Sequence, residues 1–256
     1  PAVLGLLFLG VQTIIDGIVI GNFIGPKALA SVSLILPCYN LMVALTVVLG
    51  IGCQTLVSLY SGKGDRQSVN DALTTAFGFL MLLMTGAAIG IYAGAPTFAR
   101  WLGANEVLLN GSVAYIRSLI LFFPLLGAMF FSDYILKALG HPLYSMLIMG
   151  GAVILNIGLD VLFIVRLGWG TTGAGLATGL AFMTASFFSL PFILDKRKPF
   201  SVFAGRFRPG LLGQMIYNGS SEGISELSSG VTILLFNITL MKYLGENGVA
   251  AFTVIG

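Results

Sequence analysis

Long apolar runs alternate with short polar breaks along the whole chain. The runs cover residues 1–23, 29–59, 72–95, 113–136, 143–165, 172–194 and 213–241, and an eighth begins at Val249. An α-helix needs about 20 apolar residues to cross the hydrocarbon core of a bilayer, and each complete run reaches that length. The pattern therefore predicts an all-α polytopic membrane protein with six spans, a seventh, and the start of an eighth.

The composition agrees with this prediction. Apolar residues make up 57% of the chain and charged residues only 9%, whereas a soluble domain is about 25% charged. The formal net charge of +3 is too small to indicate a nucleic-acid partner. The partner that the composition indicates is the lipid bilayer.

The basic residues predict the orientation. Spans alternate in direction, so the loops after the second, fourth and sixth spans share one side with the N-terminus. That side carries Lys63, Arg66, Lys137, Lys196, Arg197, Lys198, Arg206 and Arg208, and the other carries Lys27, Arg100, Arg117, Arg166 and Lys242. Cytoplasmic loops are enriched in Lys and Arg. We therefore expect a cytoplasmic N-terminus, in the cytoplasmic (inner) membrane.

A weak internal repeat suggests a larger plan. Residues 24–33 read IGPKALASVS and residues 244–253 read LGENGVAAFT, and both follow a span that runs outward. Parallel repeats of six spans are common in transporters. We therefore expect an amino-terminal six-helix lobe at 1–195, a basic cytoplasmic inter-lobe loop at 196–212, and the first helix and start of the second helix of a truncated second lobe at 213–256. The whole would be a fragment of a twelve-helix, two-lobe transporter.

Four polar residues in three different spans fall within one helical turn of the same depth. Asp16, Asp160 and Thr178 each lie about 9–13 Å below the predicted outer surface at about 1.5 Å rise per residue. Asn156 lies one helical turn deeper than Asp160, on the same helix face. A carboxylate in the middle of a span costs about 2.5–3.5 kcal/mol on insertion scales, so these side chains are expected to meet.

The chemistry of this set is that of a cation site. Carboxylate, amide and hydroxyl oxygens suit a hard cation, and a carboxylate pair can also hold a proton. There is no thiol or imidazole to indicate a transition metal. The alternative is structural, with Asp16 and Asp160 each hydrogen-bonding a neighbouring helix. Glu226, in the seventh span, is equally compatible with an acid that lines a cavity and with a charge near a helix start.

Five stretches resemble the multidrug and toxic compound extrusion (MATE) family, in its bacterial and archaeal branch. They are DGIVIGN at 16–22, GKGD at 62–65, LNIGLDVLFI at 155–164, GTTGAGLAT at 170–178 and SELSSGVTILLFNITLMKYLGENGVAAF at 225–252. The resemblance covers nearly the whole chain and implies two six-helix lobes around a central cleft. Its cation site maps onto Asp16, Asn156, Asp160 and Thr178, and Glu226 matches an acidic position in the seventh helix of some members.

The resemblance also implies a function. Such a protein would export small, amphiphilic, cationic compounds by antiport with Na⁺ or H⁺, as a monomer when full length, with no cofactor beyond the coupling ion and no enzymatic activity. Two alternatives remain. A flippase for lipid-linked oligosaccharides has a related architecture but favours a strongly basic cleft. An intramembrane aspartyl protease could use Asp16 and Asp160, although Asp160 lacks a Gly-x-Gly-Asp context.

Overall fold

A computed structural model describes the backbone of residues 2–195, 197 and 200–255. Lys196, Lys198 and Pro199 of the predicted inter-lobe loop lie outside the described residues. The described part is helical and contains no strand, which confirms the all-α prediction. The helices are α1 (Ala2–Phe23), α2 (Pro26–Ser33), α3 (Leu36–Gly62), α4 (Arg66–Ala93), α5 (Ala95–Trp101), α6 (Leu109–Ile120), α7 (Phe123–Ala138), α8 (Pro142–Asp160), a π-helical segment η1 (Val161–Arg166), α9 (Gly170–Leu194) and α10 (Gly210–Ile255).

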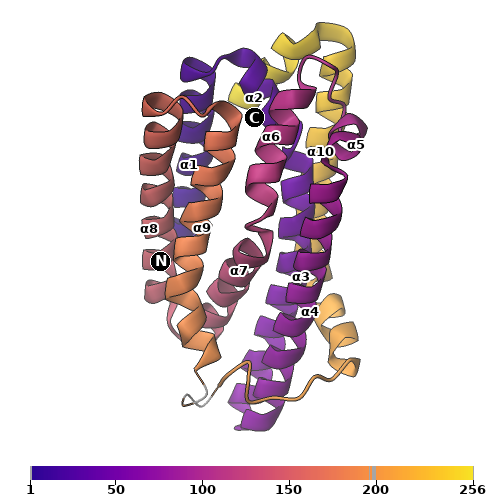
Figure 1. Cartoon of the computed structure of the whole chain (residues 1–256). Helices are drawn as coiled ribbons and strands as arrows, with labels where there is room; N and C mark the ends of the chain where they lie inside the picture. The colour runs from indigo at the N-terminus through magenta and orange to yellow at the C-terminus, as the bar shows by residue number, and fades with distance from the viewer. Residues whose placement is uncertain (1, 196, 198–199, 256) are drawn as a thin grey trace.

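The long helices run roughly side by side along one axis (Figure 1). In this view α1, α8 and α9 lie on one side, α3, α4 and α10 lie on the other, and α6 and α7 lie between them. The extensive contacts are α10 with α3, α8 with α9, α9 with α6 and α7, and α3 with α7 and α4. Small residues allow some of these helices to approach closely, as is usual in membrane bundles.

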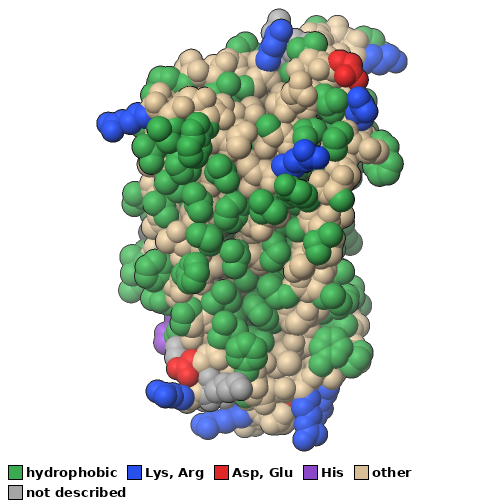
Figure 2. All heavy atoms as spheres, viewed as in Figure 1, with side chains coloured by type: hydrophobic (Ala, Val, Ile, Leu, Met, Phe, Trp, Pro, Cys, Tyr) green, Lys and Arg blue, Asp and Glu red, His purple; other side chains and the backbone are tan. Residues whose placement is uncertain are grey.

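The surface has the distribution expected of a membrane protein. Among the described residues, five helical segments are long and apolar enough to span a bilayer, with α2 and α3 counted as one, and the bent pair α6–α7 makes a sixth. The described side chains of α1 add a shorter apolar helix, Gly10–Phe23. On the face drawn in Figure 2, Lys and Arg gather towards the two ends and hydrophobic side chains cover the belt between them. The chain is a multi-pass membrane protein.

The fourth predicted span, 113–136, is not one straight helix. It forms α6 and α7, which are bent by 55° relative to each other. Pro124 lies in the first turn of α7, where its missing N–H and its ring favour a kink. The second span is also interrupted, into α2 and α3, with Pro37 in the first turn of α3, but these two helices together still form one span, Pro26–Gly62. The segment expected to be a loop after the third span contains the short helix α5.

Two glycines at equivalent places in the predicted repeat have left-handed backbones. Gly25 separates α1 from α2 with φ 114°, and Gly245 interrupts α10 with φ 65°. Residues other than glycine rarely adopt such angles. Gly245 therefore ends the seventh predicted span and begins the turn to the eighth.

The C-terminal half of α10 is fixed to α2 by a buried side chain. Asn237, with 0% of its surface exposed, donates from Nδ2 to the Ser33 carbonyl at 2.9 Å and accepts from Ser33 Oγ at 3.4 Å. We expect Asn237→Ala to destabilise the protein by about 1 kcal/mol, because it leaves buried polar groups of Ser33 unpaired. Thermal unfolding in detergent should show a melting temperature about 2–4 °C lower. Ser229→Ala, at an exposed site on the same helix, is the control, and an equal melting temperature for the two variants would refute the prediction.

Candidate functional site

The four polar residues predicted at one depth come from three helices that the fold brings together. Asn156 and Asp160 lie one turn apart near the end of α8, and both are buried, with 0% and 1% of their surfaces exposed. Asp16 on α1 and Thr178 on α9 are half-buried. The packing of α8 against both α1 and α9 places these side chains on a common interior face.

Asn156 connects the other helices. Hydrogen bonding favours the amide orientation in which Asn156 Nδ2 donates to Asp16 Oδ1 at 3.0 Å and Oδ1 accepts from the Thr178 backbone N–H at 3.3 Å. The Asn156 amide also lies 2.8 Å from the side-chain amide of Gln12. Networks of this kind fix the orientation of every member, since each group satisfies a neighbour. The amide thus links α1, α8 and α9.

Asp16 and Asp160 contact each other directly through their carboxyl groups. Two ionised carboxylates have no donor between them, so this contact requires a proton or a cation. The second oxygen of Asp160, Oδ2, is buried and has no hydrogen-bond partner in the structure. Buried polar atoms are seldom left unpaired. Asp160 therefore presents an oxygen that a bound ion or proton could satisfy.

A change of helix type follows immediately after Asp160. The chain continues as the π-helical segment η1, in which the Leu167 N–H donates to the Leu162 carbonyl at 3.0 Å, five residues back. Single π-helical turns occur frequently at functional sites. The wider turn alters the path of the helix directly beside the acidic pair.

Two neighbours of the site were not identified from the sequence. Gln12 is buried and hydrogen-bonds Asp16. Its position four residues before Asp16 on the same helix was a usable signal, because such residues share a face. Tyr115 of α6 is close enough for the charges of both Asp16 and Asp160 to act on it. Nothing in the sequence pairs Tyr115 with these residues, since the contact depends on how α6 packs.

Glu226 lies apart from this cluster. It is half-buried on α10, and its charge acts on Tyr39 of α3 and Tyr134 of α7. The charge of Asp16 also acts on Tyr39, so this tyrosine lies within electrostatic range of both acids. Glu226 is therefore not part of the acidic pair.

Other buried acids in the bundle have basic partners. Asp133 pairs with Lys137 at 2.6 Å, and Asp71 pairs with Arg208 at 2.6 Å. Within the described part of the chain, no Lys or Arg pairs with Asp16 or Asp160. No group of three or more His, Cys, Asp or Glu side chains suited to a metal is found among the described residues. The acidic pair is therefore distinguished by its lack of a neutralising cation from the protein.

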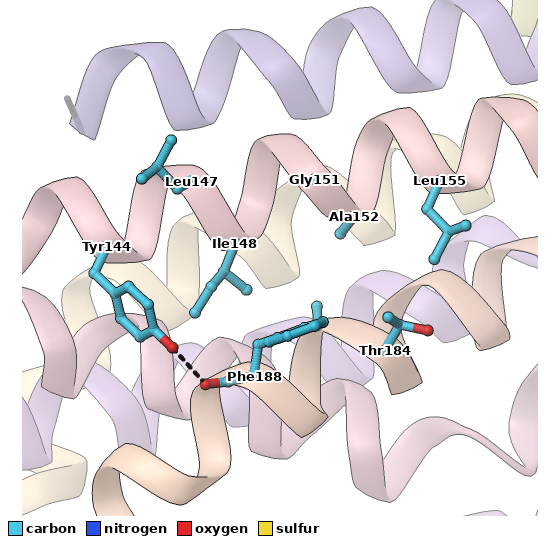
Figure 3. Close-up of a pocket in the computed structure, with 9 residues that line it drawn as sticks. Tyr144, Leu147, Ile148, Gly151, Ala152, Leu155, Thr184 and Phe188 are labelled. Atoms are coloured by element: carbon cyan, nitrogen blue, oxygen red, sulfur yellow. Dashed lines mark hydrogen bonds between the residues drawn. The ribbon is translucent and has the colours of Figure 1, made fainter.

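A separate apolar pocket of about 290 Å³ lies between α8 and α9. Figure 3 shows Ile148 of α8 near Phe188 of α9 and Leu155 near Thr184, and the Tyr144 hydroxyl donates to the Phe188 carbonyl at 2.9 Å. Asn156 and Asp160 do not line this pocket. It is thus distinct from the acidic cluster.

Comparison with known proteins places the chain in a family. The MatE family model matches residues 1–162. The multidrug export protein MepA of Staphylococcus saprophyticus is 26% identical over 257 residues, and MepA of Staphylococcus aureus is 24% identical over 262 residues. Both matches cover 99% of this chain but only 56% of the relative. The chain therefore spans little more than half the length of these relatives.

Solved structures agree with this assignment. An inward-facing multidrug resistance MATE family transporter of the MOP superfamily matches 95% of this chain and 56% of its own, with a TM-score of 0.88 and 26% identity. An outward-facing structure with the same family description matches with a TM-score of 0.83 and 26% identity, covering 98% of this chain and 56% of its own. Members of this family are transporters and not enzymes, so the protease alternative is wrong. The chain belongs to the MatE family, the multidrug and toxic compound extrusion transporters.

Proposed function

We propose that the chain is the amino-terminal lobe, with the first helix of the second lobe, of a two-lobe antiporter that exports drugs in exchange for Na⁺ or H⁺. The coupling ion binds at Asp16, Asn156, Asp160 and Thr178. The observation that carries this proposal is the buried, unpaired Asp160 oxygen beside Asp16, with no basic partner in the described chain. A pair held together only for structure would need no such free oxygen.

The ligand set fits the proposed ions. Carboxylate, amide and hydroxyl oxygens are the donors that a hard monovalent or divalent cation accepts, whereas a soft metal prefers sulfur or imidazole. A proton shared between the two carboxyl groups satisfies the same contact. No other cofactor is required.

Coupling follows from a change in affinity between two states. An ion that binds the inward- and outward-facing states with equal affinity would not change the equilibrium between them. The geometry of the site must therefore differ between the two states. Because α1 and α8 both contribute an acid, a bound cation favours their close packing and an empty site favours their separation. One charge that moves down a 100 mV potential supplies about 2.3 kcal/mol, which is enough to bias the two states.

The substrate side of the proposal rests on the relatives. Two curated relatives are multidrug export proteins, and we infer small, amphiphilic, cationic substrates. These would bind in a cleft between the lobes, with Glu226 as an acid on its wall. The long helix α10 leaves most of its span uncovered in the structure, as expected for a helix that packs against a second lobe. The complete protein would act as a monomer and without nucleic acid.

The membrane orientation is part of the same proposal. The end of the bundle at the α3–α4 turn also holds the described part of the loop between α9 and α10 (Figure 1). The sequence assigns eight of the 13 basic residues to this side of the membrane and five to the other. The positive-inside rule places this end, and the N-terminus, in the cytoplasm. The host membrane would be the cytoplasmic (inner) membrane.

The experiment that tests the proposal uses the complete transporter in proteoliposomes. Efflux of a cationic dye is measured with an inward Na⁺ gradient alone and with a pH gradient alone. Efflux that follows one gradient supports antiport and identifies the ion. Efflux indifferent to both would refute the proposal and would favour the flippase alternative.

A further inference from the structure

The segment that joins α9 to α10 is fixed to α4 along most of its described length. We call residues 200–209 the strap. The Ser201 N–H donates to Asn70 Oδ1 at 2.9 Å, the Arg206 N–H donates to Asp71 Oδ1 at 2.8 Å, and the Arg208 N–H donates to Thr75 Oγ1 at 2.8 Å. The Thr74 hydroxyl in turn donates to the Val202 carbonyl. The sequence predicted only a basic cytoplasmic inter-lobe loop here.

The four α4 residues form one docking face. Asn70, Asp71, Thr74 and Thr75 have the i, i+1, i+4, i+5 spacing that places side chains together on a helix. Each of them bonds a backbone group of the strap. The helix side chains therefore hold the backbone of the strap in a defined path.

Asp71 is the centre of this face. It has 0% of its surface exposed. Besides the Arg206 N–H, its Oδ1 accepts from Gln67 Nε2 at 2.8 Å. Its Oδ2 lies 2.6 Å from Arg208 Nε, an ion pair without hydrogen-bond geometry. A carboxylate buried in this way is stable only while its partners stay in place.

The strap also packs directly on the helix backbone. A Cβ at Gly205 would lie 2.1 Å from the Asn70 carbonyl oxygen. Ser201 and Val202 are buried, and the Val202 N–H donates to the Ile193 carbonyl of α9 at 2.9 Å. The strap is thus held between the end of α9 and the start of α4.

We propose that the strap is a permanent anchor, which stays docked on α4 through the transport cycle and fixes the start of α10 at this end of the bundle. The anchor rests on the proposed function, since it matters only if the two lobes move. Because α10 follows the strap directly, the start of α10 would then keep its place against the first lobe in both the inward- and the outward-facing states. Release of the strap in each cycle would uncover Asp71, which the packing argues against.

A matched pair of glycine variants tests whether the strap is docked. In the 256-residue chain in detergent, we expect the strap amides to exchange hydrogen at least about tenfold more slowly than an unstructured peptide. Gly205→Ala should remove most of this protection, because its Cβ meets backbone. Gly210→Ala should not, since a Cβ there meets nothing within 4 Å. Asp71→Asn, which removes the charge but keeps an acceptor, is a second variant that should raise exchange. Fast exchange in the wild-type strap would overturn the proposal.

The complete transporter tests whether the anchor is permanent. Strap exchange should agree within about twofold with and without Na⁺ and at low and neutral pH. A large rise in the exchange rate under one condition would show that the strap is released and would overturn the permanent anchor.

Gly205→Ala should slow gradient-driven efflux at least about tenfold while cation binding is kept, and normal efflux in this variant would also overturn the permanent anchor. A wild-type transporter that shows no gradient-driven efflux but a protected strap would refute the antiport proposal instead.

Discussion

Asp160→Asn is expected to abolish cation-driven efflux while leaving the protein folded. The substitution keeps the shape and the hydrogen-bonding capacity of the side chain but removes a negative charge and one of the two carboxylate oxygens. Even outer-shell partners of metal sites change affinity by about 10–100-fold when they are removed, so the loss of a direct ligand should be at least that large. The fold should survive because the change removes a buried charge and adds no volume.

The measurement for Asp160→Asn is dye efflux in proteoliposomes under the gradient that drives the wild type, together with a melting curve. Asp65→Asn is the matched control, since Asp65 lies exposed at the start of α4, where it accepts from the Ser68 N–H at 3.1 Å, and Asn caps a helix about as well as Asp. If Asp160→Asn shows the same efflux as the wild type, the acidic pair has only a structural role.

Substitution of Asp16, the partner of Asp160, provides a second test of the acidic pair. Asp16 contacts Asp160 through its carboxyl group, so the two act as one unit. Asp16→Asn alone should therefore lose about as much activity as Asp160→Asn, and the double variant little more, as is usual for residues that work together. Additive losses would mean that the two carboxylates bind separate ions.

The sequence was sufficient to predict this cluster because helical geometry is regular. The depths of Asp16, Asp160 and Thr178 follow from counting residues at a constant rise, and Asn156 follows from the spacing of one turn. What counting could not supply is contact between helices that are distant in sequence. Tyr115 comes within electrostatic range of the acidic pair through the packing of α6 in the bundle, and the π-helical turn after Asp160 has no marker in the apolar run.

The contacts of the strap with α4 could not be predicted from the sequence either. Arg206 and Arg208 were counted from the sequence as cytoplasmic positive charges, whereas the structure also gives them backbone contacts with Asp71 and Thr75. An irregular segment has no period from which its position could be derived. Asp71, next to the start of the third predicted span, was an available indication that another segment packs there, because a buried acid needs a partner.

Gly52→Ala is expected to cause the largest loss of stability among single methyl additions to α3. A Cβ at Gly52 would lie 2.1 Å from the Met215 carbonyl oxygen of α10. Both atoms belong to helix backbones, so no side-chain rotation can relieve the overlap and the helices must move apart. Overpacking of this kind costs about 1–3 kcal/mol. The melting temperature in detergent should fall by about 2–10 °C.

A glycine-to-alanine substitution at an exposed helix position should instead keep or increase the stability. Gly86 of α4 is exposed, and a Cβ there meets nothing within 4 Å. Alanine is favoured over glycine in a helix interior by about 1 kcal/mol, so Gly86→Ala should hold or raise the melting temperature. Gly219→Ala on α10 tests the contact from the other side, since its Cβ would lie 2.1 Å from the Val48 carbonyl oxygen. If Gly52→Ala and Gly219→Ala melt like Gly86→Ala, α10 does not pack tightly on α3. The anchor proposed for the strap would then lack the rigid helix that it is meant to position.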